Sequence, residues 1–513
     1  MIGILACAEP PAPAAVDPLV DLDAPRLARR MSLDLRGVLP SAEELDAVEA
    51  DPGALAGLRD AWLDDPRLGD RVVALLHERW RTRVDRFDIP YYDYGFSLEE
   101  EPAYVRSVGE EPLRLVARVV TEDRSWSEVV TADWTVADET LAGIWPLAYP
   151  EGATGWQEAR YTDGRPAAGV LATNGLWWRY TTNTSNMNRA RAAAISDLLL
   201  CEDILARPVS FSAAELGDPA TAVRTEPACL ACHAGVDPLA ASLFGFWWQT
   251  MYSVVEQTTY HPEREGLAEQ ELGVSPAYFG TPIEGLSELG WAVASDPRLY
   301  SCAVETFAAG LWRREVALDD AARLEALRIV FLDEGARVRP LLAAITDDAT
   351  YRAGGVRDGA PDDVVARERT RRMLAPEQLA SAVEDLTGFR WASQRWDQMT
   401  SDRYGYRVLA GGVDGATVYT PQTVPGLTWE VVTRRLAEGA AAHAVEAGAW
   451  PTDPDVAVAA RDLHWRLYAE RADEAWLGEV EGLWLAVEAE AGEDAAWAAV
   501  LAASLRDPRF LFE

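Results

Sequence analysis

The feature that most constrains this chain is a five-residue run, Cys229-Leu230-Ala231-Cys232-His233. C-x-x-C-H is the attachment pattern of a c-type haem. Side chains three and four positions apart lie on one face of a helical turn, which lets both thiols reach the two vinyl groups of one porphyrin. His233 then lies beneath the iron as the proximal ligand. The pattern therefore predicts a helix that carries one covalently bound haem c.

Three other interpretations of this run have less support. A structural zinc site needs a second pair of ligands at matching spacing, and the chain contains no other C-x-x-C and no H-x-x-x-H pattern. A thioredoxin-like redox pair needs a strand before it and a helix after it, whereas Pro227 precedes the run and Asp237-Pro238 follows it. The third interpretation is a chance occurrence on a folded surface. Haem is favoured over all three because the N-terminus indicates export.

The N-terminus resembles the end of a bacterial lipoprotein signal. The run from Ile4 to Cys7 matches its cleavage region, so Cys7 is the expected lipidated residue. Ala8, and not Asp, follows this cysteine, which favours sorting to the outer membrane, and residues 8–15 are typical of a Pro/Ala-rich tether. The basic part and most of the apolar part of a signal are missing, so we expect a start codon further upstream. The alternative is that Cys7 is incidental. The predicted location is the cell envelope, either periplasmic or as an outer-membrane lipoprotein.

Composition and charge narrow the range of partners. The chain has 513 residues, of which 49% are hydrophobic, enough for roughly two to four globular domains. Its formal net charge is −36 at pH 7, whereas nucleic-acid binding and charge-driven docking on anionic lipid both need a basic surface. No apolar run is long enough to span a membrane. We expect no nucleic-acid partner, membrane contact only through a lipid anchor, and an unidentified redox partner protein. The oligomeric state stays open.

Two further cysteines, Cys201 and Cys302, remain after lipidation and haem attachment are assigned. In an oxidising compartment they can pair, and a bond that closes so long a loop stabilises by about 4–5 kcal/mol in the chain-entropy model. The alternative is two buried free thiols, since each lies on an apolar helical stretch. Spacing alone does not decide between them.

Hydrophobic periodicity predicts a mainly α fold with several helical subdomains and long loops around the haem motif. We expect a truncated signal and tether over 1–22, an N-terminal helical domain over 23–180 and a haem-binding helical domain over 181–352. A linker rich in Gly, Asp and Arg is expected over 353–374, and a C-terminal helical domain over 375–513.

An Asp-Pro-Arg phrase occurs at 65–67, 296–298 and 507–509, each time after an amphipathic stretch. Asp can cap the next helix while Pro lies in its first turn. The phrase therefore predicts a reused helix–turn–helix unit, and its irregular spacing argues against a regular solenoid.

Aromatic residues gather in two places. Residues 91–96 read Tyr-Tyr-Asp-Tyr-Gly-Phe and predict an aromatic loop. Residues 243–248, shortly after the haem motif, read Leu-Phe-Gly-Phe-Trp-Trp. Bulky apolar residues close to a haem exclude water and raise its potential. We expect 243–248 to form a wall of the haem site, with ordinary core packing as the alternative.

Several segments make the chain resemble a known group. Residues 27–37 read L-A-R-R-M-S-L-D-L-R-G, similar to an opening R-x-S-L-D-L-x-G, and 131–136 read T-A-D-W-T-V, similar to A-D-Y-T-x-V. Leu-Leu-Cys at 199–201 precedes the motif, and 228–239 matches C-x-x-C-H-x-x-[IM]-D-P-[IL] in most positions. On these segments the chain resembles the haem-c-containing families of unknown function from planctomycetes and myxobacteria, the "planctomycete cytochrome C" group.

The resemblance implies a secreted haem protein and supplies no established reaction. It also places Cys302 where those families often keep a cysteine, just after a D-P-R-F-like phrase. The chain lacks the histidine often found before the motif, and Val236 stands where a methionine is sometimes seen. The resemblance therefore leaves the sixth iron ligand open.

We expect an exported mono-haem c-type cytochrome-like protein that transfers electrons. This function needs a sixth ligand, preferably Met, for which Met251 and Met187 are candidates, with His261 behind them. A haem-dependent oxidoreductase, peroxidase- or oxygenase-like, is one alternative. It needs an open iron face and a distal acid or base, and Arg189 and Arg191 are the candidates.

A non-catalytic, cell-surface polysaccharide-binding protein is the other alternative. Some of the 20 Trp residues would then stack on sugar rings. The sequence assigns no catalytic residue.

Overall fold

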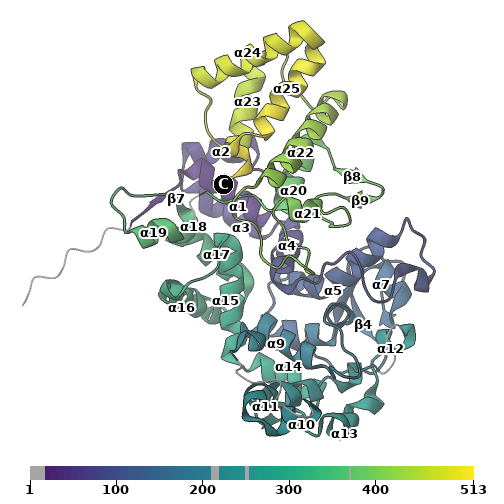
Figure 1. Cartoon of the computed structure of the whole chain (residues 1–513). Helices are drawn as coiled ribbons and strands as arrows, with labels where there is room; N and C mark the ends of the chain where they lie inside the picture. Colours follow the sequence, from purple (N-terminus) through teal and green to yellow (C-terminus); the bar gives the residue numbers. More distant parts are fainter. Residues whose placement is uncertain (1–17, 209–218, 249–252, 369–370) are drawn as a thin grey trace, which may run out of the picture.

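The computed structural model describes residues 18–208, 219–248, 253–368 and 371–513, and Figure 1 shows their arrangement. Helices account for 60% of the structure and strands for 6%. The predicted mainly α class is therefore confirmed.

The helices before the haem motif follow the N-terminal strand. They are α1 (Ala24–Leu35), α2 (Ala42–Ala50), α3 (Ala54–Leu63), α4 (Arg67–Trp80), α5 (Glu101–Thr121), α6 (Glu128–Thr131), α7 (Glu139–Ile144), α8 (Asn174–Arg179) and α9 (Arg189–Leu200). Short 3-10 turns, which include η1 (Tyr91–Tyr94), η2 (Gly169–Ala172) and η3 (Ile204–Ala206), lie between or after them.

The middle of the chain carries the haem motif. Its helices are α10 (Pro219–Thr225), α11 (Pro227–Ala241), α12 (Val254–Thr258), α13 (Ala268–Leu272), α14 (Leu286–Ala294), α15 (Pro297–Trp312), α16 (Ala321–Asp333), α17 (Val338–Asp347), α18 (Ala349–Arg352) and α19 (Asp362–Arg367).

The helices of the last part of the chain are α20 (Pro376–Thr387), α21 (Tyr406–Leu409), α22 (Leu427–Glu446), α23 (Val456–Tyr468), α24 (Glu474–Ala491), α25 (Glu493–Leu505) and α26 (Pro508–Leu511). Three of them, α23 to α25, lie at the top of Figure 1.

The strands are short and all pair antiparallel. They are β1 (Leu19–Asp21), β2 (Thr135–Ala137), β3 (Leu147–Ala148), β4 (Gln157–Tyr161), β5 (Ala277–Tyr278), β6 (Thr281–Pro282), β7 (Ala353–Val356), β8 (Ala392–Ser393) and β9 (Trp396–Asp397). One sheet has the order β2-β4-β3, and the others are the pairs β1-β7, β5-β6 and β8-β9. In β1-β7, Val20 lies opposite Gly355, so the end of the expected tether pairs with the start of the expected linker.

Two large core clusters organise the described chain. The first contains buried residues of α1, α4, α5, α9, α11, α15 and α17, among others. The second contains buried residues of α20 and of α22 to α26. Helix α1 contributes to both, because Met31 packs in the first cluster and Leu33 in the second. The two clusters therefore meet across α1, and the haem motif belongs to the first.

The Asp-Pro-Arg phrases act as helix starts, as predicted. Asp296 caps α15 by accepting a hydrogen bond from the backbone N–H of Arg298, and Asp507 caps α26 through the backbone N–H of Arg509. In the copy at 65–67, the side chain of Asp65 accepts the corresponding hydrogen bond. The capping role of the phrase is confirmed at Asp296 and Asp507, whereas α4 has Pro66 at its N-cap position and no side-chain cap.

Pro112 lies inside α5 and so donates no backbone hydrogen bond to the carbonyl of Val108. Gly175 of α8 packs on that carbonyl, where a Cβ would lie 2.2 Å from the oxygen. The N–H of Gly175 donates to the neighbouring carboxylate of Glu111 at 2.7 Å. Glu111 is completely buried.

Candidate haem-attachment site

Helix α11 divides into an exposed half that carries the motif and a buried half that anchors it. Pro227 occupies the first turn, where its missing N–H costs nothing. The buried residues of α11 all lie after the motif: Val236, Asp237, Leu239, Ala240 and Ala241. The C-terminal half therefore fixes the helix in the core and leaves the motif at the surface.

The three side chains of the motif share one face of α11. Cys229, Cys232 and His233 stand at positions i, i+3 and i+4 of a continuous helix, which brings them onto one side. Both thiols are free and half-buried, and 26% of the His233 side chain is exposed. These residues fit the proximal side of a c-type haem. In the described ranges, no three or more His, Cys, Asp or Glu side chains are grouped to hold a metal ion.

His233 has a carboxylate partner one turn further along α11. Its Nδ1–H donates to Asp237 Oδ1 at 2.8 Å. The same carboxylate accepts two hydrogen bonds from Arg189, the first residue of α9: Nε to Oδ1 at 2.7 Å and Nη2 to Oδ2 at 3.0 Å. A ligating histidine commonly has its second nitrogen fixed in this way by a carboxylate. The arrangement leaves Nε2 of His233 as the nitrogen that can bind iron.

Asp237 is ionised in this arrangement. Its side chain is buried, which by itself raises the pKa of a carboxyl group, but the hydrogen bonds from His233 and Arg189 outweigh burial and lower the pKa of Asp237 below its usual value. A carboxylate that stays charged makes the imidazole of His233 a stronger donor to a metal.

A disulfide stabilises the neighbourhood of the motif. The structure contains the bond between Cys201, at the end of α9, and Cys302 of α15, with a Cα–Cα distance of 5.2 Å and a sequence separation of 101. This is one of the two alternatives that spacing left open. The bond joins two helices of the first core cluster.

The segment that follows Cys201 packs against the motif. The carbonyl of Ile204 lies 4.0 Å from the sulfur of Cys232. Arg207 donates to the carbonyl of Ala231 at 3.3 Å. The disulfide therefore anchors one end of a segment whose other end borders the haem-attachment residues.

The three candidate sixth ligands differ in how the structure places them. His261 has partners at both ring nitrogens, Glu263 Oε1 and the carbonyl of Glu256, each at 3.2 Å. Met187 is half-buried against the first core cluster, two residues before Arg189. Met251 lies outside the described residues, as does the lipidation candidate Cys7. Met187 is therefore the described candidate nearest in sequence to a residue of the site.

The two arginines considered as distal acids or bases have structural roles instead. Arg189 binds Asp237, on the side of the proximal ligand. Arg191 is fully buried and donates to the carbonyls of Tyr180, Trp177 and Phe246. A guanidinium that uses its N–H groups on backbone oxygens is not available for proton transfer.

The aromatic run after the motif belongs to the protein core and not to an open wall. Phe244, Phe246, Trp247 and Trp248 each expose 5% of their surface or less. Phe246 contacts the ring of Tyr260 at a centroid distance of 4.9 Å. The alternative of ordinary core packing describes this run, because protein atoms already cover these rings.

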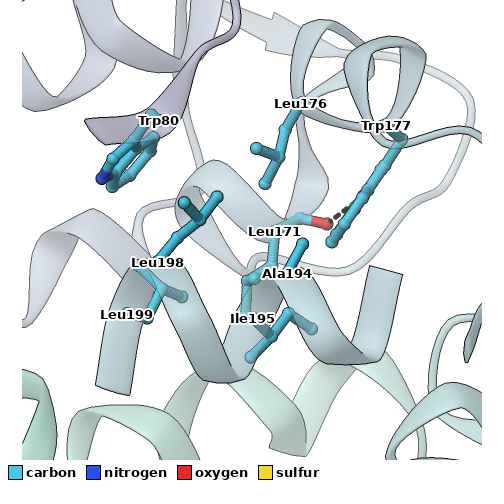
Figure 2. Close-up of a pocket in the computed structure, with 8 residues that line it drawn as sticks. All are labelled: Trp80, Leu171, Leu176, Trp177, Ala194, Ile195, Leu198 and Leu199. Carbon is cyan, nitrogen blue, oxygen red and sulfur yellow. Dashed lines mark hydrogen bonds between the residues drawn. The ribbon is translucent and has the colours of Figure 1, made fainter. Parts of the chain in front are cut away.

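Figure 2 shows an apolar void between α4, η2, α8 and α9, of about 10 Å³. Its lining consists of Trp80, Leu171, Leu176, Trp177, Ala194, Ile195, Leu198 and Leu199. The indole N–H of Trp177 donates to the carbonyl of Leu171 at 2.8 Å, beside the void. A void that holds about one water molecule and is lined by carbon is a packing gap and not a ligand site.

Sequence reasoning missed the partner of the proximal histidine. Asp237 was visible only as part of a helix-breaking Asp-Pro pair, yet α11 continues through Pro238. A carboxylate at i+4 from the motif histidine was the available signal. Arg189 joins the site from a distant element, and no local pattern reports that contact.

No family model, curated protein or solved structure matches this chain. None of the helices within the described ranges has the length and apolar character needed to cross a membrane.

Proposed function

We propose that the chain binds one haem c covalently through Cys229 and Cys232, with His233 as an axial iron ligand, and that it transfers single electrons in the cell envelope. The lipid anchor at Cys7 and the likeness to the planctomycete cytochrome C group are parts of the same proposal. When bound, the haem supplies an iron that changes its oxidation state by one electron.

One observation carries the proposal. The motif lies on a surface-facing helical turn with its histidine oriented by Asp237 through Nδ1, at 2.8 Å. The hydrogen bond at Nδ1 leaves Nε2 of His233 as the nitrogen for the iron. The same pairing is the usual outer-shell support of a metal-bound histidine.

The residues around the motif have separable tasks. The two thiols hold the porphyrin, and His233 presents Nε2. Asp237 fixes the ring of His233, and Arg189 keeps Asp237 charged and in position through two hydrogen bonds. The buried half of α11 and the disulfide hold these groups in place, which suits electron transfer because little has to move when the iron changes its charge.

A haem-dependent oxidoreductase is the second candidate, and the same carboxylate supports it. A charged partner makes the imidazole more basic, and a strongly donating axial ligand favours oxidised iron, as thiolate does in oxygen-activating haem enzymes. The two candidates differ at the second axial position, which an electron-transfer protein fills and an oxidoreductase leaves open.

Spectroscopy of the exported, haem-loaded chain tests this proposal. Low-spin, six-coordinate bands that carbon monoxide does not change are expected for electron transfer. High-spin bands and rapid carbon monoxide binding would instead establish an open iron face and contradict electron transfer.

Two variants sharpen the assignment of ligands. Met187→Leu should convert a low-spin spectrum to a high-spin one if Met187 is the sixth ligand, since Leu keeps the volume and removes the sulfur. His443→Gln is the control, because His443 lies on α22 and contacts the ring of Phe389. This variant should leave the spectrum unchanged.

A further inference from the structure

A second site, independent of the haem motif, lies at the beginning of α5. A cavity of about 290 Å³ opens between the segment that follows α4, the turn η1 and the first turn of α5. Arg403, which lies between β9 and α21, completes its lining. Small-molecule sites are typically about 300–1,000 Å³, so this cavity has room for a small ligand.

Aromatic side chains form much of its surface. Phe87 and Tyr104 expose 5% and 1% of their surfaces and belong to a third, smaller core cluster. They form the buried side of the cavity. Tyr91 and Tyr92 of η1 lie edge to face with a centroid distance of 5.3 Å. Tyr92 exposes 63% of its surface. This is the aromatic loop that the sequence predicted, and it presents an open ring beside a preformed hollow.

Two carboxylates in the wall have oxygens that are buried and lack hydrogen-bond partners among the described residues. They are Oε2 of Glu101 and Oδ2 of Asp85. Glu101 exposes only 8% of its surface, and burial raises the pKa of Asp85. A buried acceptor without a partner destabilises a folded protein, because it has lost its hydrogen bonds to water. Both oxygens therefore favour a ligand that brings O–H or N–H donors.

The charges of the lining cancel. Arg86 and Arg403 stand with Asp85 and Glu101 around the cavity, and Arg403 Nη2 lies 3.9 Å from Glu101 Oε1. Two cations against two anions give no net charge, so the cavity does not select a charged ligand by attraction. Hydroxyl groups suit this mixture, because they donate to carboxylates and accept from guanidinium groups.

We propose that this cavity binds a neutral saccharide, with one sugar ring over Tyr92 and its hydroxyls hydrogen-bonded to Glu101, Asp85 and the two arginines. The apolar face of a sugar ring packs on an aromatic face, and its hydroxylated edge meets the polar groups. An organic cation is the competing ligand, since it also binds aromatic rings and carboxylates, but the two arginines oppose it.

Isothermal titration calorimetry on the full-length, haem-loaded chain tests the proposal. The probes are cellobiose, maltose and N,N′-diacetylchitobiose as saccharides, and tetramethylammonium chloride as the organic cation. We expect saturable binding of at least one disaccharide and no saturable binding of the cation.

Two variants locate the binding in the cavity. Tyr92→Ala removes the exposed ring, and Glu101→Gln removes the charge of the buried acceptor while keeping its shape. Each should weaken binding of the responding disaccharide about tenfold. Trp291→Ala is the matched control, because Trp291 is also 63% exposed but lies on α14, and its affinity should equal that of the unaltered chain.

Three outcomes would overturn the proposal. They are the absence of saturable binding for all three disaccharides, saturable binding of tetramethylammonium alone, and disaccharide binding that both cavity variants leave unchanged while their melting temperatures match that of the unaltered chain.

Discussion

Two histidines, His233 beside the first core cluster and His464 beside the second, are held in opposite ways. His233 has one ring nitrogen bonded to the carboxylate of Asp237, and 26% of its side chain is exposed. His464 is buried and both nitrogens have partners, the carbonyl of Glu470 at 2.7 Å and Arg509 Nη1 at 3.1 Å. His464 also contacts the rings of Tyr468 and Trp476 at 4.5–4.8 Å.

The difference lies in how much of each imidazole ring the protein itself occupies. His464 uses its whole ring within the protein and contributes to the second core. In the proposed function, His233 uses Nδ1 for its hydrogen bond to Asp237 and keeps Nε2 for the iron. Cys232 packs against the first cluster, and the disulfide found in the described residues joins α9 and α15, two helices of that cluster. The predictions below test this division.

Loss of the attachment cysteines has the largest expected effect. Cys229→Ser with Cys232→Ser should abolish covalent haem completely, because the other two cysteines of the described residues, Cys201 and Cys302, are joined in a disulfide. Haem staining after denaturing electrophoresis measures this. The control is His464→Gln, which should keep the full haem stain, and equal loss in both variants would remove the distinction between the two regions.

Removal of the disulfide should affect the first region selectively. Cys201→Ala with Cys302→Ala releases a loop with a sequence separation of 101, which should lower the free energy of unfolding by about 4–5 kcal/mol. Hydrogen exchange resolved by peptide measures where protection is lost. We expect α9 and α15 to lose protection from exchange and α22 to α25 to keep it. A uniform loss of protection along the chain would show that the two core clusters are not independent.

Two buried groups, Glu111 in the first region and His464 in the second, should make pH-dependent contributions to stability with opposite signs. Burial raises the pKa of Glu111 from 4.5 to about 7, against its hydrogen bonds. The folded state therefore holds this proton longer than the unfolded state, and stability falls by about 3 kcal/mol as pH rises from about 4.5 to 7. Burial lowers the pKa of His464, so the second region should lose stability as pH falls below 6.5.

Region-resolved hydrogen exchange at several pH values measures both slopes. Glu111→Gln should reduce the loss of stability of the first region as pH rises, and His464→Gln should reduce the loss of stability of the second region as pH falls. If either variant flattened both slopes, the two clusters would unfold as one unit.

The smallest effect is expected from the partner of the proximal histidine. Asp237→Asn keeps the shape and removes the charge, which should reduce the donor strength of His233 and weaken its bond to oxidised iron about 10–100-fold. For one electron this raises the midpoint potential by about 60–120 mV. Redox titration measures the shift. Arg509→Gln, which removes the partner of His464, should leave the potential unaltered.

The sequence predicted features that depend on local pattern. The helical class, the Asp caps of the Asp-Pro-Arg phrases and the aromatic loop at 91–96 all follow from residues close together in the chain. The C-x-x-C-H run is also a local pattern, and the attachment of haem to it stays a prediction. Local patterns work here because capping and helical spacing are decided within one or two turns.

Features that depend on distant contacts were not predicted. Arg29 is 3% exposed and donates to the carbonyls of Leu467 and Phe510, more than 430 residues away. Arginine is normally a surface residue, so the sequence gives no reason to place it between two cores. The contact of Arg189 with Asp237 and the cavity closed by Arg403 depend on tertiary packing in the same way.

The central claim is that a haem is covalently attached to α11, and one measurement tests it most directly. The chain is exported together with a c-type haem maturation system, and its intact mass and pyridine haemochrome spectrum are recorded. We predict the added mass of one haem, a c-type haemochrome, and no alkylation of Cys229 or Cys232. A colourless protein in which both thiols are alkylated would contradict the account.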